Sequence, residues 1–163
     1  MTETSEFDSY DARILGELQR DARITMAQLG RVVHLSQPAV TERVRKLELC
    51  GAIKGYRAQV DYQRLGYGIR AIVRVGRVEY ARVVKLVEQT PEVINAFNVT
   101  GEDSWVLEIA VIDVAHLDVV VSKFCVVTET ATCIVLNALR EHAPVLPARR
   151  DSIKPTIKKV TGR

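Results

Sequence analysis

The stretch that decides the fold is Thr25–Gly51, TMAQLGRVVHLSQPAVTERVRKLELCG, which predicts two helices joined by a tight turn. Thr25 opens the first helix with a capping box, because Gln28 stands three positions later. Ser36 caps the second helix, and Gly51 is a natural helix stop. This layout predicts a helix-turn-helix, the motif that places its second helix in the major groove of DNA.

Apolar residues at helical spacing predict one core shared by three helices. A helix that starts near Asp8 or Ser9 precedes the quoted stretch. The expected apolar positions of the three helices, in chain order, are Tyr10, Ile14, Leu15 and Leu18, then Met26, Leu29, Val32 and Val33, then Val40, Val44 and Leu47. We therefore expect a three-helix, winged-type helix-turn-helix domain at the N-terminus.

A polar stripe on another side of the second motif helix supplies candidate DNA contacts. Its members are Ala39, Glu42, Arg43 and Lys46, with Arg45 turned to a different side. Ala39 is small enough for close approach to a base edge or a thymine methyl group. Arg43 can donate a fork of hydrogen bonds to guanine or phosphate, and Lys46 suits a phosphate.

Three further residues belong to the expected DNA contact. Ser36 and Gln37 lie at the helix end that usually enters the groove, and Arg31 on the preceding helix can touch the backbone. The alternative is a plain three-helix domain whose basic residues form a solvated face. The agreement of spacing, caps and turn favours DNA binding.

The remainder of the chain predicts the order β-α-β-β-α-β, a ferredoxin-like split βαβ arrangement. The expected elements are a strand at 69–78, a helix at 80–89, strands at 93–100 and 105–112 joined by the turn 101–104, a helix at 114–124 and a strand at 128–139. A strand at 53–60 leaves the first domain. We expect domains at 1–60, with the motif at about 26–45, and at 69–141, a linker at 61–68 and a flexible tail at 142–163.

Composition indicates a globular chain with charged ends. Its 163 residues are 47% hydrophobic, and no apolar run suits a membrane span or a secretory signal. Three scattered cysteines, Cys50, Cys125 and Cys133, favour a reduced cytoplasm over a disulfide framework. Residues 61–148 carry eight Lys/Arg against eleven Asp/Glu, whereas residues 149–163 carry six against one. The tail can therefore be a solvated end or a source of extra phosphate contacts.

The N-terminal half resembles the Lrp/AsnC (leucine-responsive regulatory protein) family. The matching elements are Asp-x-x-Ile-Leu from Asp11, Asp-Ala-Arg-Ile from Asp21, Leu-Ser-x-x-x-Val-x-x-Arg-Val-x-x-Leu-Glu from Leu35, and Gly-x-Ile-x-Gly-Tyr from Gly51. Gly101–Trp105 falls where the family has a Gly-Asp/Glu-x-Asp-Tyr turn, and the run from Thr130 resembles its Thr-x-Thr-x-x-Val-Leu strand. The resemblance covers roughly residues 8–141.

This resemblance implies a small-molecule site and a homo-oligomer. Family members bind effectors, usually amino acids, between subunits near the hairpin turn, and form dimers that often assemble further, up to octamers. Carried over, the effector-binding candidates are Gly101, Glu102, Asp103, Ser104, Thr130 and Thr132. Two departures stand out: Ser104 replaces the second acid of the turn, and Cys125-Val126-Val127 replaces a Pro-Gly-Val turn. The alternative is that the effector-binding candidates are ordinary turn and strand residues without a binding role.

The sequence thus predicts an α+β protein, a helix-turn-helix domain followed by a βαββαβ (RAM/ACT-like) domain. The expected function is a cytoplasmic transcriptional regulator that binds double-stranded, pseudo-palindromic operator DNA and responds to an amino acid, with no catalytic residues, cofactor or metal. The alternatives are an architectural DNA-binding protein without a ligand and a siroheme-decarboxylase-like enzyme. Scattered histidines, His34, His116 and His142, speak against the enzyme and against a metal site.

Overall fold

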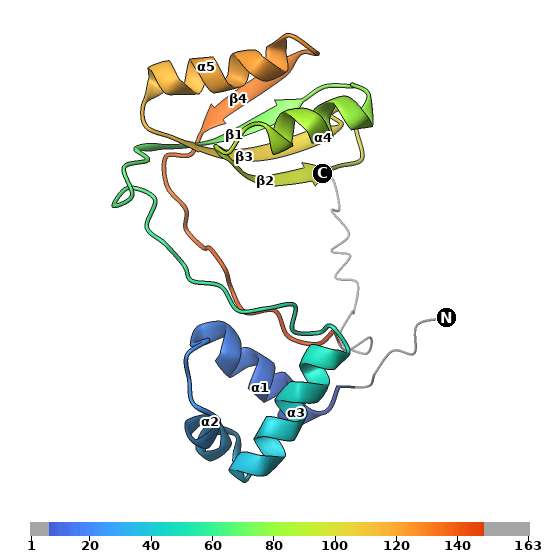
Figure 1. Cartoon of the computed structure of the whole chain (residues 1–163), viewed down its shortest axis with the longest axis vertical. Coiled ribbons are helices and arrows are strands. Elements are labelled where there is room, and N and C mark those ends of the chain that lie inside the picture. The colour runs from blue at the N-terminus through green and yellow to red at the C-terminus, as the bar shows by residue number, and fades with distance from the viewer. Residues whose placement is uncertain (1–6, 149–163) are drawn as a thin grey trace, which may run out of the picture. The chain divides into compact units, whose positions relative to one another are not determined.

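The computed structural model describes residues 7–148. These residues divide into two compact units, residues 7–58 with 142–148 and residues 59–141. Figure 1 labels the helices and strands of both. No helix in the described part of the chain is long and apolar enough to cross a membrane.

The first unit contains three helices, α1 (Ser9–Arg20), α2 (Met26–Val33) and α3 (Gln37–Leu49). The predicted caps Thr25 and Ser36 are confirmed, and of Asp8 and Ser9 it is Asp8 that caps the first helix. Each of the three accepts a backbone N–H of the helix that it begins. Thr25 and Gln28 complete the predicted capping box. The first helix gains a second box that the sequence analysis did not identify, between Asp8 and Asp11.

The turn between α2 and α3 depends on Gly30. The backbone oxygen of Leu35 would lie only 2.7 Å from a Cβ atom at this position, so a larger residue would push the turn away. His34 adopts the left-handed conformation at the end of α2, with φ of 62°. Arg13 of α1 donates to the Val32 carbonyl at 2.7 Å, which satisfies a carbonyl that the end of α2 leaves open.

The three helices bury one small core. Its buried members are Ile14, Leu18, Leu29, Val33, Val40, Val44 and Leu47. Seven of the eleven expected apolar positions are therefore in the core, whereas Tyr10 and Val32 are exposed. Their side chains are 37% and 43% exposed, respectively.

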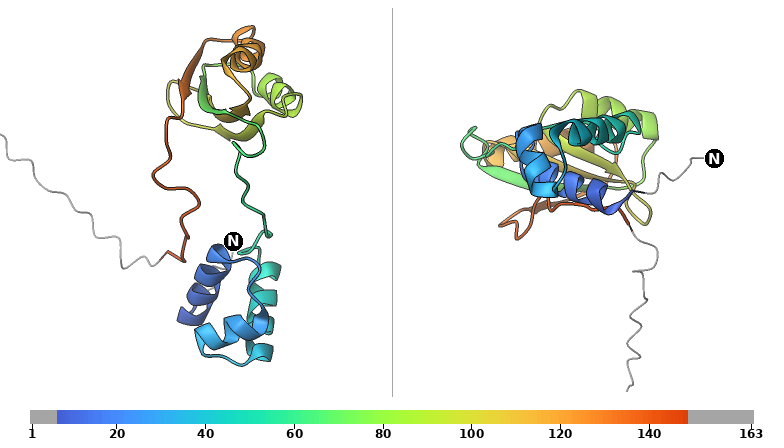
Figure 2. Two further views of the ribbon diagram at one scale, coloured as in Figure 1. Left: turned by 90° about the vertical axis from the view of Figure 1, so that its left-hand side faces the viewer. Right: turned by 90° about the horizontal axis from the view of Figure 1, so that it is seen from below.

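The second unit is a four-stranded antiparallel sheet of order β2-β3-β1-β4. Its elements are β1 (Ile69–Val75), α4 (Tyr80–Glu88), β2 (Val93–Asn98), β3 (Trp105–Val111), α5 (Val114–Cys125) and β4 (Thr130–Ile134). This is the predicted βαββαβ order. Both helices lie on the same side of the sheet, as the views in Figure 2 make clear.

Alternation along the strands explains this arrangement. Ala71, Val73 and Val75 of β1 are buried against the helices. Trp105, paired with Val75, is 6% exposed and contacts Tyr80 in a tilted arrangement, with ring centroids 5.2 Å apart. Trp105 therefore belongs to the core of the second unit. The opposite face of the sheet carries no helix of the described chain.

Two predicted strands differ from the structure. Residues 53–60 form no strand, because no described segment of the chain pairs with them and a lone extended segment leaves its peptide groups to water. The last strand ends at Ile134 instead of Leu139. It pairs with residues 71–75 of β1 in the antiparallel direction. Ile134 is paired with Ala71, near the start of β1, so little of β1 remains beyond it to pair with a longer strand.

The described part of the predicted flexible tail, residues 142–148, contacts the first unit. The side-chain amide of Gln19 in α1 donates to the Val145 carbonyl at 2.9 Å and accepts its N–H at 2.8 Å. The side chain of Leu146 lies over Gly16, 3.4 Å from where a Cβ atom would stand. We call residues 142–148 the C-terminal arm. The basic residues 149–163 lie outside the described residues.

Candidate DNA-binding and effector sites

The packing of α3 determines which of its side chains remain available. Val40, Val44 and Leu47 face the core, so the rest of the helix surface is open to a partner. The four residues of the expected contact stripe do lie together. They line a shallow hollow between the start of α1 and α3, whose wall consists of Phe7, Asp11, Ala39, Glu42, Arg43, Lys46, Leu47, Leu49 and Cys50.

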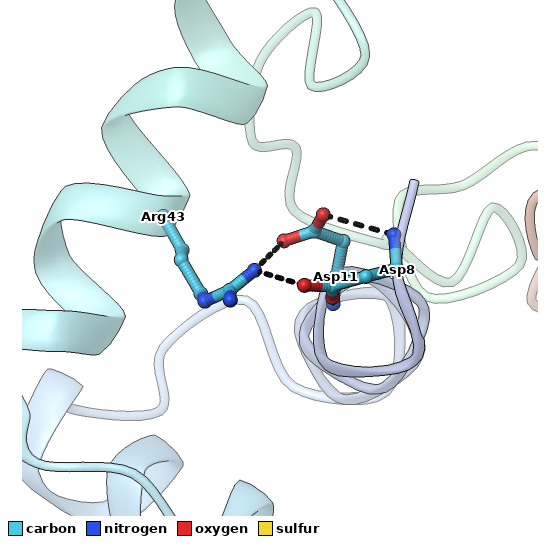
Figure 3. Close-up of polar contacts among 3 residues, drawn as sticks. All are labelled: Asp8, Asp11 and Arg43. Atoms are coloured by element: carbon cyan, nitrogen blue, oxygen red, sulfur yellow. Dashed lines mark hydrogen bonds and ion pairs between the residues drawn. The ribbon is translucent and has the colours of Figure 1, made fainter. Parts of the chain in front are cut away.

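Arg43 is bound to α1. One guanidinium nitrogen, Nη1, lies 2.8 Å from Oδ2 of Asp8 and 2.8 Å from Oδ1 of Asp11 (Figure 3). The guanidinium carbon also lies 5.4 Å from the ring centroid of Tyr10. The expected DNA contact therefore has an intramolecular partner, which sequence spacing did not reveal.

The two aspartates that hold Arg43 also begin α1. Asp11 N–H donates to Asp8 Oδ1 at 2.8 Å, and Asp8 N–H donates to Asp11 Oδ2 at 3.2 Å. The Asp11 N–H lowers the pKa of the Asp8 carboxyl, and Arg43 lowers this pKa further. The hydrogen bonds to Asp11 and Asp8 raise the pKa of Arg43. We call Asp8, Asp11 and Arg43 the α1–α3 clamp.

The other expected contacts are exposed except for Ala39, which is half-buried. Lys46 and Arg31 form no ion pair within residues 7–148, and Gln37 begins α3 with its side chain exposed. Ser36 is engaged as the helix cap, with its oxygen 3.4 Å from the Ala39 nitrogen. In the described part of the chain, Arg45 pairs only with Glu42 on the same helix, through hydrogen bonds of 3.0 and 2.9 Å.

The expected effector residues converge at the end of β1. The turn 101–104 joins β2 to β3, and Ser104 N–H donates to the Val75 carbonyl at 2.9 Å. On the other side of β1, Thr130 is paired with Val75 and Thr132 with Val73. The turn and Thr130 therefore flank the same residue of β1, although 26 positions separate Ser104 from Thr130.

The two acids of this turn have different environments. Asp103 forms an ion pair with Arg74 of β1, with Oδ2 and Nε 3.2 Å apart. Glu102 is exposed and has no ion pair in the described chain. Gly101 has φ of 124° and open space beside it, so its backbone is accessible. Amides and acids of this kind can hold a carboxylate and an ammonium group.

Sequence reasoning missed the partners of two site residues. Arg74 interrupts an apolar strand, and this interruption is the signal that could have marked it as facing away from the core. Asp8 and Asp11 stand three positions apart at the start of α1, a spacing that indicates a helix cap but not a bond to α3.

Comparison with known proteins decides the family. Residues 7–48 match the model of the AsnC-type helix-turn-helix domain, and residues 70–145 match that of the Lrp/AsnC ligand binding domain. The HTH-type transcriptional regulator LrpC of Bacillus subtilis is 31% identical over 136 residues, which cover 82% of this chain and 94% of LrpC. The chain belongs to the Lrp/AsnC family.

Other proteins of known sequence or structure show the same family resemblance. The HTH-type transcriptional regulator Rv2324 of Mycobacterium tuberculosis is 34% identical over 84% of this chain and 97% of its own length. The solved structure of B. subtilis LrpC has a TM-score of 0.79 at 30% identity, covering 83% of this chain and 98% of that one. The feast or famine regulatory protein Rv3291c of M. tuberculosis, solved with L-methionine, has a TM-score of 0.78 at 28% identity, covering 86% of this chain and 99% of that one.

Proposed function

We propose that this chain is a transcriptional regulator that binds operator DNA through α3 and responds to an amino acid bound at the end of β1. The observation that carries the proposal is the presence, in one chain, of a capped helix-turn-helix and a split βαβ unit whose polar turn converges with Thr130. A DNA-binding unit joined to a ligand-binding unit has the two sites that effector control requires. Acting on chromosomal DNA, it works in the cytoplasm.

The proposed DNA contact consists of exposed polar groups around α3 together with the small side chain of Ala39. Ser36 and Gln37 lie at the N-terminus of α3, where the helix enters the groove. Lys46 and Arg31 supply positive charge for phosphates. Ala39 and Glu42 complete this surface, and Arg43 supports it from within the α1–α3 clamp.

The proposed effector site is the turn 101–104 together with Thr130 and Thr132. Turn amides bind the effector's carboxylate, the threonine hydroxyls add hydrogen bonds, and Glu102 or Asp103 holds the ammonium group. The L-methionine complex of the related protein Rv3291c supports an amino acid as the effector class.

We further propose that the uncovered face of the sheet joins two copies into a homodimer, which can assemble further. Phe97 on this face is 54% exposed, and its neighbours include Val106, with which it is paired. An exposed aromatic residue on a sheet face without helices favours a second sheet as cover. Two-fold symmetry then sets paired α3 helices about 34–36 Å apart for a pseudo-palindromic operator.

A thermal-shift screen of the full chain against the twenty amino acids tests the effector. We expect the melting temperature to rise with the concentration of one or a few of them, including L-methionine, because a ligand that binds only the folded state stabilises it. Thr130→Val keeps the side-chain shape and should reduce the shift. No shift with any amino acid would favour the architectural, ligand-free alternative.

Sedimentation equilibrium tests the dimer. The unaltered chain should sediment as a dimer or a larger even assembly, and Phe97→Asp should dissociate it because the carboxylate would be buried without a partner. Val126→Asp, at an exposed position near the end of α5, is the matched control. A monomeric unaltered chain would contradict the proposal.

A further inference from the structure

Helix α3 carries two arginines two positions apart, and their surroundings differ. We propose that Arg45 is the arginine of α3 that contacts DNA, whereas Arg43 is a positioning residue that fixes α3 against α1. This assignment rests on the proposed DNA-binding function. It exchanges the roles that spacing alone suggests, because Arg43 belongs to the expected stripe and Arg45 does not.

Helix geometry separates the two side chains. At about 100° per residue, Arg43 leaves α3 about 70° from the middle of the stripe formed by Val40, Val44 and Leu47. Arg45 leaves it about 130° from the same line, on the side away from the core. Arg43 therefore starts beside the core and points toward α1, as Figure 3 shows. Arg45 starts on the exposed side of α3, the side of a recognition helix that can face a groove.

Arg43 would have to give up several intramolecular interactions in order to contact DNA. Its side chain is 32% exposed, and its Nη1 donates to the carboxylates of Asp8 and Asp11 at 2.8 Å each. Turning outward would break both charge-assisted hydrogen bonds and the contact with the Tyr10 ring. It would also leave two unpaired carboxylates beside the DNA phosphates, where like charges repel.

Arg45 would give up only a weak interaction on contacting DNA. Its side chain is 60% exposed, and its only ion pair in the described chain is with Glu42, whose side chain is 48% exposed. A pair of this kind between exposed groups of one helix contributes little to stability and is weakened by salt. A phosphate or a guanine can replace Glu42, because the guanidinium fork matches both.

The clamp gives Arg43 a different influence on recognition. Asp8 and Asp11 are part of the cap of α1, so Arg43 ties the start of one helix to the middle of the other. Base contacts require side chains to be placed within a fraction of an ångström, whereas phosphate contacts tolerate more displacement. Loss of the clamp should therefore weaken operator binding selectively and leave binding to arbitrary DNA unchanged.

The experiment compares variants of the full chain on two probes. One is a duplex selected from random-sequence DNA by the unaltered chain, and the other is a shuffled duplex of equal length. Fluorescence anisotropy gives the dissociation constants at salt concentrations from about 50 to 300 mM, because the affinity of proteins for DNA depends steeply on salt. The variants are Arg43→Ala, Arg45→Ala, Lys46→Ala and Asp8→Asn with Asp11→Asn. Asparagine still caps a helix, so the aspartate variant removes charge and keeps the cap.

The expected results separate the two arginines. Arg45→Ala should weaken selected-duplex binding about 10- to 100-fold, either with relaxed sequence preference or with a salt slope smaller by about one. Arg43→Ala should weaken only selected-duplex binding, about 10-fold, with an unchanged salt slope. The aspartate variant should reproduce that loss, and combining it with Arg43→Ala should add nothing, because one interaction is being removed twice.

Three results would overturn the assignment. Arg45→Ala could bind both probes as tightly as the unaltered chain. Arg43→Ala could reduce the salt slope by about one, as a direct phosphate contact would. The aspartate variant could bind the selected duplex as well as or better than the unaltered chain, as a freed DNA-contacting Arg43 would. If the unaltered chain selected no duplex at all, the regulator function itself would fail, and this outcome is distinct from the other three.

Discussion

Gln19 and Val145 are joined by a two-way hydrogen bond, in which the Gln19 amide donates to the Val145 carbonyl at 2.9 Å and accepts its N–H at 2.8 Å. The two residues are 126 positions apart, and the whole second unit lies between them in sequence. The chain thus leaves the DNA-binding unit after residue 58 and returns to it at residue 142. The C-terminal arm is part of the DNA-binding unit in contact as well as in connectivity.

Removal of the Gln19 amide should release the arm. In Gln19→Ala, the Val145 amide loses its acceptor, and its hydrogen exchange should rise to the rate of an unstructured peptide. The stability of α1 should fall by no more than about 1–2 kcal/mol, because the lost hydrogen bonds are exposed. Gln19→Glu is the matched control, since it keeps the acceptor and removes only the donor. Unprotected exchange at Val145 in the unaltered chain would contradict the docking.

Two buried glycines of the helix-turn-helix unit should respond to alanine in opposite ways. Gly30→Ala should destabilise the chain by about 1–3 kcal/mol, because its Cβ would stand 2.7 Å from the Leu35 carbonyl oxygen. Gly16→Ala should stabilise it by about 0.5–1 kcal/mol, because glycine is a poor helix former and only the flexible Leu146 side chain lies near, at 3.4 Å. Urea unfolding, monitored by the circular dichroism of the helices, measures the free energy of unfolding of both variants. Equal changes of the same sign would refute this account of the turn.

Acid should weaken the second unit through Glu92. Its own backbone N–H lowers the pKa of this carboxyl, and His116 and Lys123 lower it further. Because the pKa of Glu92 in the folded state is below the ordinary value of 4.5, the stabilisation is complete above about pH 4.5 and is lost as the pH falls through the folded pKa. Glu92→Gln should be less stable than the unaltered chain at pH 7 and match it in strong acid. Glu88→Gln, at an exposed position, is the control, and parallel stability curves for Glu92→Gln and the unaltered chain would oppose the prediction.

Removal of residues 149–163 should reduce the salt dependence of DNA binding. This segment carries six basic residues and one acidic residue, and the C-terminal arm fixes the preceding residues to the DNA-binding unit. Each phosphate contact contributes about 0.9 to the slope of log affinity against log salt, so truncation should lower the slope by up to about 5. A tail of equal length with glutamine at the basic positions should behave like the truncation. An unchanged slope would mean that the tail is only a solvated end.

Local signals in the sequence determined most of the fold. The caps at Thr25 and Ser36, the stop at Gly51 and the order of the βαββαβ elements all follow from side chains within a few residues of one another, and the structure has them. The alternating burial of β1 likewise follows from the period of two in a strand. Such features need no knowledge of distant partners.

Only the tertiary structure decided what the polar side chains of these elements touch. The engagement of Arg43 depends on Asp8 and Asp11, which lie 35 and 32 positions away and meet it only when α1 packs on α3. The same holds for Asp103 with Arg74 and for Gln19 with Val145. The length of β4 and the unpaired state of residues 53–60 were also tertiary outcomes, since a strand exists only where another strand satisfies its hydrogen bonds. Periodicity identifies which face of an element is polar, but the identity of the partner depends on packing between segments that the sequence keeps far apart.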